Sequence, residues 1–239
     1  MGVDPADAAR RPNVKDALPL LRAEQELEHE FIAEVTDQPD PPQGWTATQV
    51  MFHLAQWRER LRNALSEAAA GRRVDAPSGN IDELNDLEMA GAGDVTLAGE
   101  AARSEAALAS LIATLETMGA QPFTWYTAAT TAEAIVRNSY VHPRIHIADQ
   151  FRERGDVPRS DRLFEETASE LRKVEAPGHI LGASLFNLAS VRATQGRSDE
   201  ALTLLEEALP MRPDLRAILP GDPEFAALRE SPRFRTLLD

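Results

Sequence analysis

The sequence contains no cysteine among its 239 residues. Disulfides, cysteine-ligated zinc, iron–sulfur clusters and a cysteine nucleophile are therefore excluded, and the absence fits a reducing compartment. No stretch approaches the roughly 18–20 apolar residues that a membrane-spanning helix requires, and the first 21 residues lack the apolar core of a secretory signal. We therefore expect a cytoplasmic protein without a membrane partner.

Positive charge is also scarce, with 25 Lys+Arg against 39 Asp+Glu and a formal net charge of −14. Only two of the basic residues are lysine, a bias that we interpret as that of a GC-rich bacterial genome. Nucleic acids and anionic membranes favour clustered cations, so we expect neither as a partner. The acidic runs predict solvent-exposed helix faces, and we expect His29 on the surface among one such run, Glu24, Glu26, Glu28 and Glu30.

Apolar residues recur at spacings of three, four and seven along most of the chain, which predicts an all-α fold of amphipathic helices. The first four long stripes are sufficient for a four-helix bundle, which we place in residues 1–158. The predicted helices run from Val14 to Val35, from Thr46 or Thr48 to about Gly71, from Leu97 to Met118 and from about Thr131 to Arg154, with a short helical turn in residues 81–89.

The pattern changes after Pro158. Small and apolar residues from Leu185 to Pro213 have the spacing of one tetratricopeptide repeat, although Arg192 stands where an aromatic residue is often found. We therefore predict a second domain, 159–239, made of a helical hairpin followed by short capping helices. One repeat cannot close a core alone, so it must pack on the bundle, on a helix over 161–174 or on another chain, for example in a homodimer.

Three of the five histidines form a candidate metal site. His142 and His146 are four residues apart, which places both imidazoles on one helix face, and His53 lies at the edge of the core stripe of the second helix. If the two helices are neighbours, three imidazoles converge. Such a set with an open position suits Zn²⁺, Ni²⁺, Co²⁺ or Fe²⁺. The alternative is that the histidines form hydrogen bonds at a helix seam without metal.

Several neighbouring residues have two interpretations each. Gln56 and Arg60 share the helix edge of the first histidine, where they would line a substrate pocket or form a solvated face. Asp149 and Gln150 follow the last histidine by three and four residues, so each would orient an imidazole, bind water or form a surface contact. Trp125 and Tyr126 precede the fourth helix, and we expect core packing or a pocket wall there.

Pro143 lies between the two paired histidines. It lacks the N–H that would bond the Ser139 carbonyl, and it biases His142 away from the helical region of backbone space. The sequence allows either a kinked helix at this point or a helix that begins at His142.

Three segments carry a resemblance to a known family. GWTATQVMFHLAQW contains His53, IDELNDLEM follows it, and NSYVHPRIHIADQ contains the other two histidines. They resemble the second helix, a later loop and the fourth helix of the DinB/YfiT-like superfamily of metal-binding four-helix bundles, over roughly residues 13–155. The resemblance implies that His53, His142 and His146 bind a divalent metal, with Zn²⁺ or Ni²⁺ foremost.

The same resemblance implies a metal-dependent enzyme that acts on a small molecule. The expected reactions are transfer with a low-molecular-weight thiol, such as mycothiol or bacillithiol, and hydrolysis or isomerisation. A metal-bound water or thiol would supply the nucleophile. The alternative is a non-catalytic interaction module, with a structural or vestigial metal site and a repeat unit that binds a partner or dimerises.

Overall fold

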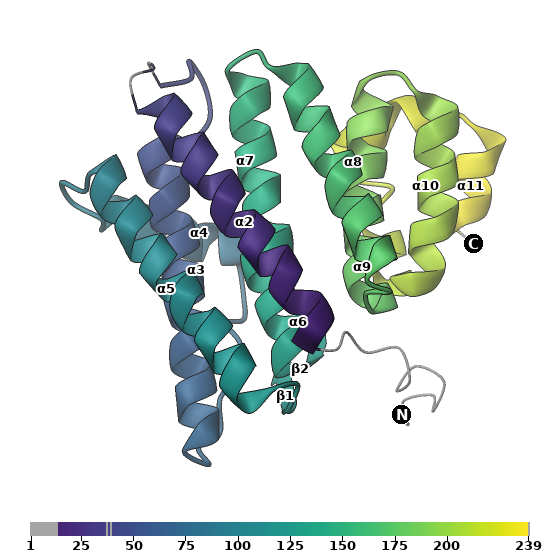
Figure 1. Cartoon of the computed structure of the whole chain (residues 1–239). Coiled ribbons are helices and arrows are strands. Elements are labelled where there is room, and N and C mark those ends of the chain that lie inside the picture. Colours follow the sequence, from purple (N-terminus) through teal and green to yellow (C-terminus); the bar gives the residue numbers. More distant parts are fainter. Residues whose placement is uncertain (1–13, 37, 39, 239) are drawn as a thin grey trace. The chain divides into compact units, whose positions relative to one another are not determined.

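The computed structural model describes residues 14–36, 38 and 40–238, and the fold over them is all-α with one short β-hairpin (Figure 1). The chain divides into two compact units, one that ends at Ser160 and one that begins at Asp161. Residues 1–13 of the predicted first domain lie outside the described residues. Within the described part, no helix is both long and apolar enough to span a bilayer.

Four long helical segments build the first unit, as the apolar stripes predict (Figure 1). Three are single helices, and the fourth is a continuous run of an α-helix, a π-helical turn and a second α-helix. The elements are α2 (Val14–Val35), α3 (Ala47–Ala69), α4 (Ile81–Ala90), α5 (Leu97–Met118), β1 (Pro122–Trp125), β2 (Ala128–Thr130), α6 (Thr131–Val136), η1 (Arg137–Val141) and α7 (His142–Glu153).

Helix α3 begins with a capping box, which decides between the two candidate starts in favour of Thr46. The Gln49 backbone N–H donates to Thr46 Oγ1 at 3.1 Å, and the Thr46 N–H donates to Gln49 Oε1 at 2.8 Å. From this fixed start, the helix buries Val50 and Leu54 in the core. His53, between them, is only 4% exposed.

Pro143 is accommodated by the π-helical turn η1, and α7 begins at His142. The His142 N–H reaches back to the Arg137 carbonyl, one residue further than in an α-helix. The bias of Pro143 against helical geometry at His142 is overcome, because the φ and ψ of His142 are −62° and −46°, and α7 begins at this residue, as the second of the two alternatives has it. The Ser139 carbonyl that Pro143 leaves without its usual donor lies 3.4 Å from Nη2 of Arg58. A side chain from α3 thus replaces the missing backbone bond.

The prediction of a fully solvated acidic face on α2 is wrong for two of its four glutamates. Glu24 and Glu28 are 0% and 4% exposed, whereas Glu26 and Glu30 lie on the surface. The buried pair continues the core stripe of α2, because Leu21, Glu24, Glu28 and Phe31 are spaced by three, four and three residues. Apolar positions on both sides therefore place these carboxylates in the core.

The buried carboxylates are paired with two buried arginines. Arg58 donates from Nη1 to Glu28 Oε2 at 2.8 Å and to Ser104 Oγ at 2.7 Å, and its Nη2 contacts the other Glu28 oxygen. Arg144 donates from Nε to Glu24 at 2.9 Å. Burial and the neighbouring Glu28 raise the pKa of Glu24 to about 8, against the lowering effect of Arg144. This charge network ties α2, α3, α5 and the fourth helical segment together.

The second unit contains the predicted helical hairpin and the short helices after it (Figure 1). Gly182 marks the crossing of the hairpin, where an added Cβ would lie 2.8 Å from Met211 Cβ and 3.1 Å from the Ala208 carbonyl oxygen. Phe225 and Phe234 anchor the capping segments in the core. The elements are α8 (Val157–Lys173), which begins in the first unit, α9 (Gly178–Thr194), α10 (Ser198–Met211), η2 (Pro213–Ala217), η3 (Pro223–Leu228) and α11 (Pro232–Leu238).

Candidate metal centre

The structure brings His53, His142 and His146 together. His142 Nε2 lies 3.0 Å from Nε2 of His53 and 3.0 Å from Nε2 of His146. One ring nitrogen from each of the three residues falls within 4.8 Å of the others. Metal–imidazole bonds of about 2.0–2.1 Å hold neighbouring ligand nitrogens about 3.0–3.4 Å apart. The two short separations match a shared ion and also match hydrogen bonds between the rings, the two alternatives that the sequence leaves open.

The backbone of two helical segments positions these side chains. His53 is in the middle of α3, held in register by the capping box at the start of the helix. His142 is the first residue of α7, directly after the π-helical turn, and His146 follows one helical turn later. The π-helical turn therefore sets the direction from which the pair on α7 meets the ring on α3.

Burial keeps the three imidazoles neutral. It lowers the pKa of His53 to about 3, with help from His146 and Arg60, and it lowers the pKa of His146 to about 4. Burial and the other two rings lower the pKa of His142 well below its usual value. Neutral rings offer lone pairs to a cation, and the cluster contains no carboxylate. The donor set thus fits a divalent ion, although metal binding itself stays a prediction.

We expect the metal-free protein to lose stability as the pH falls from 6.5 towards 4. Unfolding lets each histidine return to an ordinary pKa, so in this window the unfolded chain binds more protons than the folded one. Stability should fall by about 1.4 kcal/mol per pH unit for each of the three while the folded rings stay neutral. Glu24, whose pKa is raised to about 8, gives a slope of the opposite sign in this window and offsets one of the three. Urea unfolding in the presence of a chelator, at several pH values, measures this slope.

His146→Gln provides the comparison, because it removes one of the titrating groups and leaves the carboxylates unchanged. The slope of stability against pH should become shallower in this variant. Identical slopes in the two proteins would show that His146 is not held neutral by the fold.

Two tryptophans frame the cluster, which the sequence did not indicate. The Trp45 ring stacks on His146 at 5.4 Å and meets His53 edge-on at 4.8 Å. The Trp57 ring lies 6.2 Å from His53 and 6.1 Å from His142. In the sequence, Trp45 precedes the second predicted helix and Trp57 lies on its apolar stripe, which indicates a helix start and a core residue. The contact of Trp57 with His53 follows from their spacing of four residues on α3, whereas the contacts with His142 and His146 depend on α3 and α7 being neighbours, which no local signal shows.

Gln150 and Asp149 differ in their surroundings. Gln150 is 1% exposed, and its Nε2 donates to the Trp45 carbonyl at 2.5 Å. It therefore holds the backbone of Trp45, whose ring stacks on His146. Asp149 has a half-exposed side chain 3.8 Å from Arg152 on the same helix, which agrees with its interpretation as a surface ion-pairing residue.

The two candidates on α3, Gln56 and Arg60, also have different contacts. Gln56 accepts a hydrogen bond from Arg103 on α5. Arg60 pairs with Glu88 on α4, and its guanidinium carbon lies 4.7 Å from the centre of the Trp57 ring. Arg60 thus belongs to the edge of the histidine cluster, whereas Gln56 does not.

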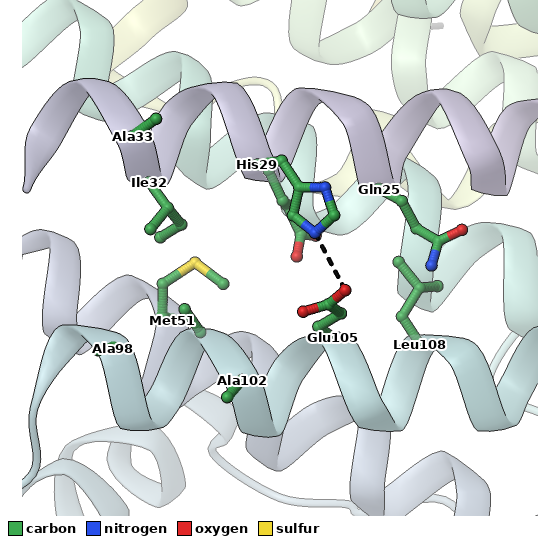
Figure 2. Close-up of a pocket in the computed structure, with 11 residues that line it drawn as sticks. Gln25, His29, Ile32, Ala33, Met51, Ala98, Ala102, Glu105 and Leu108 are labelled. Atoms are coloured by element: carbon green, nitrogen blue, oxygen red, sulfur yellow. Dashed lines mark hydrogen bonds and ion pairs between the residues drawn. The ribbon is translucent and has the colours of Figure 1, made fainter.

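A separate groove of about 360 Å³ lies between α2 and α5. Figure 2 shows His29 and Glu105 facing one another across it, with a separation of 3.1 Å between His29 Nε2 and Glu105 Oε1. The His29 side chain is 61% exposed, which confirms the prediction that this histidine lies on the surface. None of the three clustered histidines lines this groove.

Comparison with known proteins identifies one region. Residues 141–214 match the tetratricopeptide repeat family, a span longer than the roughly 34 residues of the single repeat that the spacing indicated. The match includes His142 and His146 and crosses residue 158, so the boundary at 158 stays a prediction. It covers less than half of the chain. No curated protein and no solved structure matches the sequence.

Proposed function

We propose that the protein is a divalent-metal-dependent enzyme that acts on a small molecule. The observation that carries the proposal is the convergence of three neutral imidazole nitrogens from two helices, without a carboxylate among them. Their setting in a four-helix bundle agrees with the resemblance to the DinB-like superfamily. Zn²⁺ and Ni²⁺ are the metals that we expect foremost.

The histidines, the tryptophans and Gln150 have different roles in this proposal. His53, His142 and His146 would hold the ion and leave positions open to solvent or substrate. The ion, when bound, lowers the pKa of a water or thiol so that an anionic nucleophile exists near neutral pH. Trp45 and Trp57 restrict the access of water, and Gln150 fixes Trp45. Because the chain has no cysteine, a thiol must come from a separate small molecule.

Titration with Co²⁺ tests the proposal, because bound Co²⁺ has visible absorption bands that report its coordination. We expect about one ion per chain and a spectrum that changes when a small thiol is added. A protein without metal affinity would overturn the proposal. Turnover of mycothiol or bacillithiol conjugates by the loaded protein would then identify the reaction class.

A second function is favoured by the match to tetratricopeptide repeats. Such repeats commonly mediate protein–protein interaction, and we propose that residues 159–239 bind a partner protein or a second copy of the chain. This role is compatible with an enzyme in the first unit. It becomes the main function if the protein takes no metal and forms a dimer in sedimentation experiments.

A further inference from the structure

Two polar atoms near the histidine cluster are buried without a hydrogen-bond partner among the described residues. They are Nη1 of Arg60 and the hydroxyl oxygen of Tyr126. Buried polar groups are nearly always hydrogen-bonded, so two such atoms at one place call for an explanation. Both side chains can donate a hydrogen bond, and Arg60 cannot lose its charge at physiological pH.

The two atoms belong to side chains that both lie against Trp57, and the charge of Arg60 is close enough to Tyr126 to help lower its pKa against the larger, raising effect of burial. The guanidinium of Arg60 lies 4.7 Å from the Trp57 ring centre, and the Tyr126 ring lies 6.4 Å from it. Trp57 in turn contacts His53 and His142, the first histidine of each helix. The charge of Arg60 also helps to lower the pKa of His53, after the larger effect of burial. The two donors therefore sit beside the candidate metal ligands.

Helix α4 fixes the direction of Arg60. Glu88 binds its Nη2 group, while Asn85 Oδ1 accepts the Trp57 indole N–H at 3.1 Å. With one nitrogen held by Glu88 and the guanidinium stacked on Trp57, Nη1 is presented in a fixed place. Glu88 also offsets part of the positive charge of Arg60, which favours a monoanion over a dianion such as phosphate.

The backbone at Tyr126 is strained in a way that a glycine would relieve. Trp125 and Ala128 are paired across the hairpin, so Tyr126 is the first residue of a two-residue turn. Its φ is +52°, a conformation that glycine commonly provides at this position. Bulky residues held at positive φ cluster at functional sites. The strain is a second sign that the Tyr126 side chain is needed at this position.

We propose that the substrate carries a carboxylate, which accepts hydrogen bonds from Nη1 of Arg60 and the hydroxyl of Tyr126 while its reacting group reaches the metal. Arginine and tyrosine donors match the two oxygens of a carboxylate, and hydrogen bonds to ionised groups are the stronger ones. This inference rests on the proposed metal-dependent function and adds a substrate class to it.

The test compares two thiols that differ in the distal group, 3-mercaptopropionate and 3-mercapto-1-propanol, on the Co²⁺-loaded protein. The charge-transfer band from thiolate to Co²⁺ reports the binding of each. We expect 3-mercaptopropionate to bind about tenfold more tightly, because one charge-assisted hydrogen bond contributes about that factor in affinity. The chain's net charge of −14 works against this preference. Chelation of Co²⁺ by the carboxylate would also produce a preference, and the Arg60 and Tyr126 variants separate it from binding to these two side chains.

Arg60→Gln and Tyr126→Phe should each reduce the preference while the Co²⁺ spectrum stays unchanged. Arg62→Gln is the matched control, because Arg62 is also on α3 and contacts Asn63 instead of the cluster. A normal Co²⁺ spectrum with equal or absent binding of the two thiols would overturn this inference and leave the metal proposal standing. A preference that survives in Arg60→Gln would overturn it too, and failure to bind Co²⁺ would overturn the metal proposal with it.

Discussion

Replacement of His146 by alanine will reduce the metal content of the purified protein nearly to zero. The remaining pair, His53 and His142, has one short separation of 3.0 Å and supplies only two imidazoles. Two imidazoles make a weak site for any divalent ion, because the binding free energy depends on the number of ligands. Elemental analysis of protein purified without a histidine tag measures the loss, beside circular dichroism to show that the helices persist.

His29→Ala is the matched control for this experiment. It removes a histidine from the same unit, but this side chain is exposed and paired with Glu105 instead of the cluster. We expect the control to keep its full metal content. Equal metal content in the two variants would mean that the ion binds elsewhere, and the assignment of the three histidines would be wrong.

Replacement of Arg58 by alanine will cost about 3–5 kcal/mol of unfolding free energy, the usual result of breaking a buried ion pair on one side. Arg58 is 0% exposed and binds Glu28, Ser104 and the Ser139 carbonyl. Its loss leaves a buried carboxylate and a carbonyl without donors. Urea unfolding measures the change in stability.

The double variant Arg58→Met with Glu28→Leu separates charge from packing. It removes both charges and keeps much of the buried volume, so most of the stability should return. The pair Arg172 and Glu207 offers a control, because both side chains are about 40% exposed and Arg172→Ala should cost at most about 1 kcal/mol. A similar small cost for Arg58→Ala would show that the network is not buried in solution.

The sequence predicts the helices well because each one follows from local chemistry. Stripes at helical spacing define the four segments of the first unit, and residues such as Thr46 and Gly119 mark their ends. The acidic run predicts an exposed face for Glu24 and Glu28, whereas their burial follows from their position along the helix. Leu21 and Phe31, at core spacing on either side, were the signal that could have placed Glu24 and Glu28 inside.

The candidate site is predictable only in part, for a related reason. The spacing of His142 and His146 is local information, and the helix edge of His53 indicated which side it would face. The contacts of Trp45 with His146 and of Trp57 with His142 arise from neighbouring helices, and the contact of Tyr126 with Trp57 arises from a hairpin, so no local pattern predicts them. The outcome at Pro143 also depended on a distant group, since Arg58 satisfies the carbonyl that the proline frees.

The π-helical turn also affects the direction in which the side chains after it face. Positions at four-residue intervals along the fourth segment are all buried: Ala132, Val136, Tyr140, Arg144 and Ala148. In a regular α-helix each such step advances about 40° beyond a full turn, so the last position would face nearly the opposite way from the first. The wider turn absorbs part of this drift. Because each hydrogen bond of the turn spans one residue more than in an α-helix, deletion of one residue within it would restore the α-helical ladder and keep His142 and His146 in nearly the same direction relative to His53.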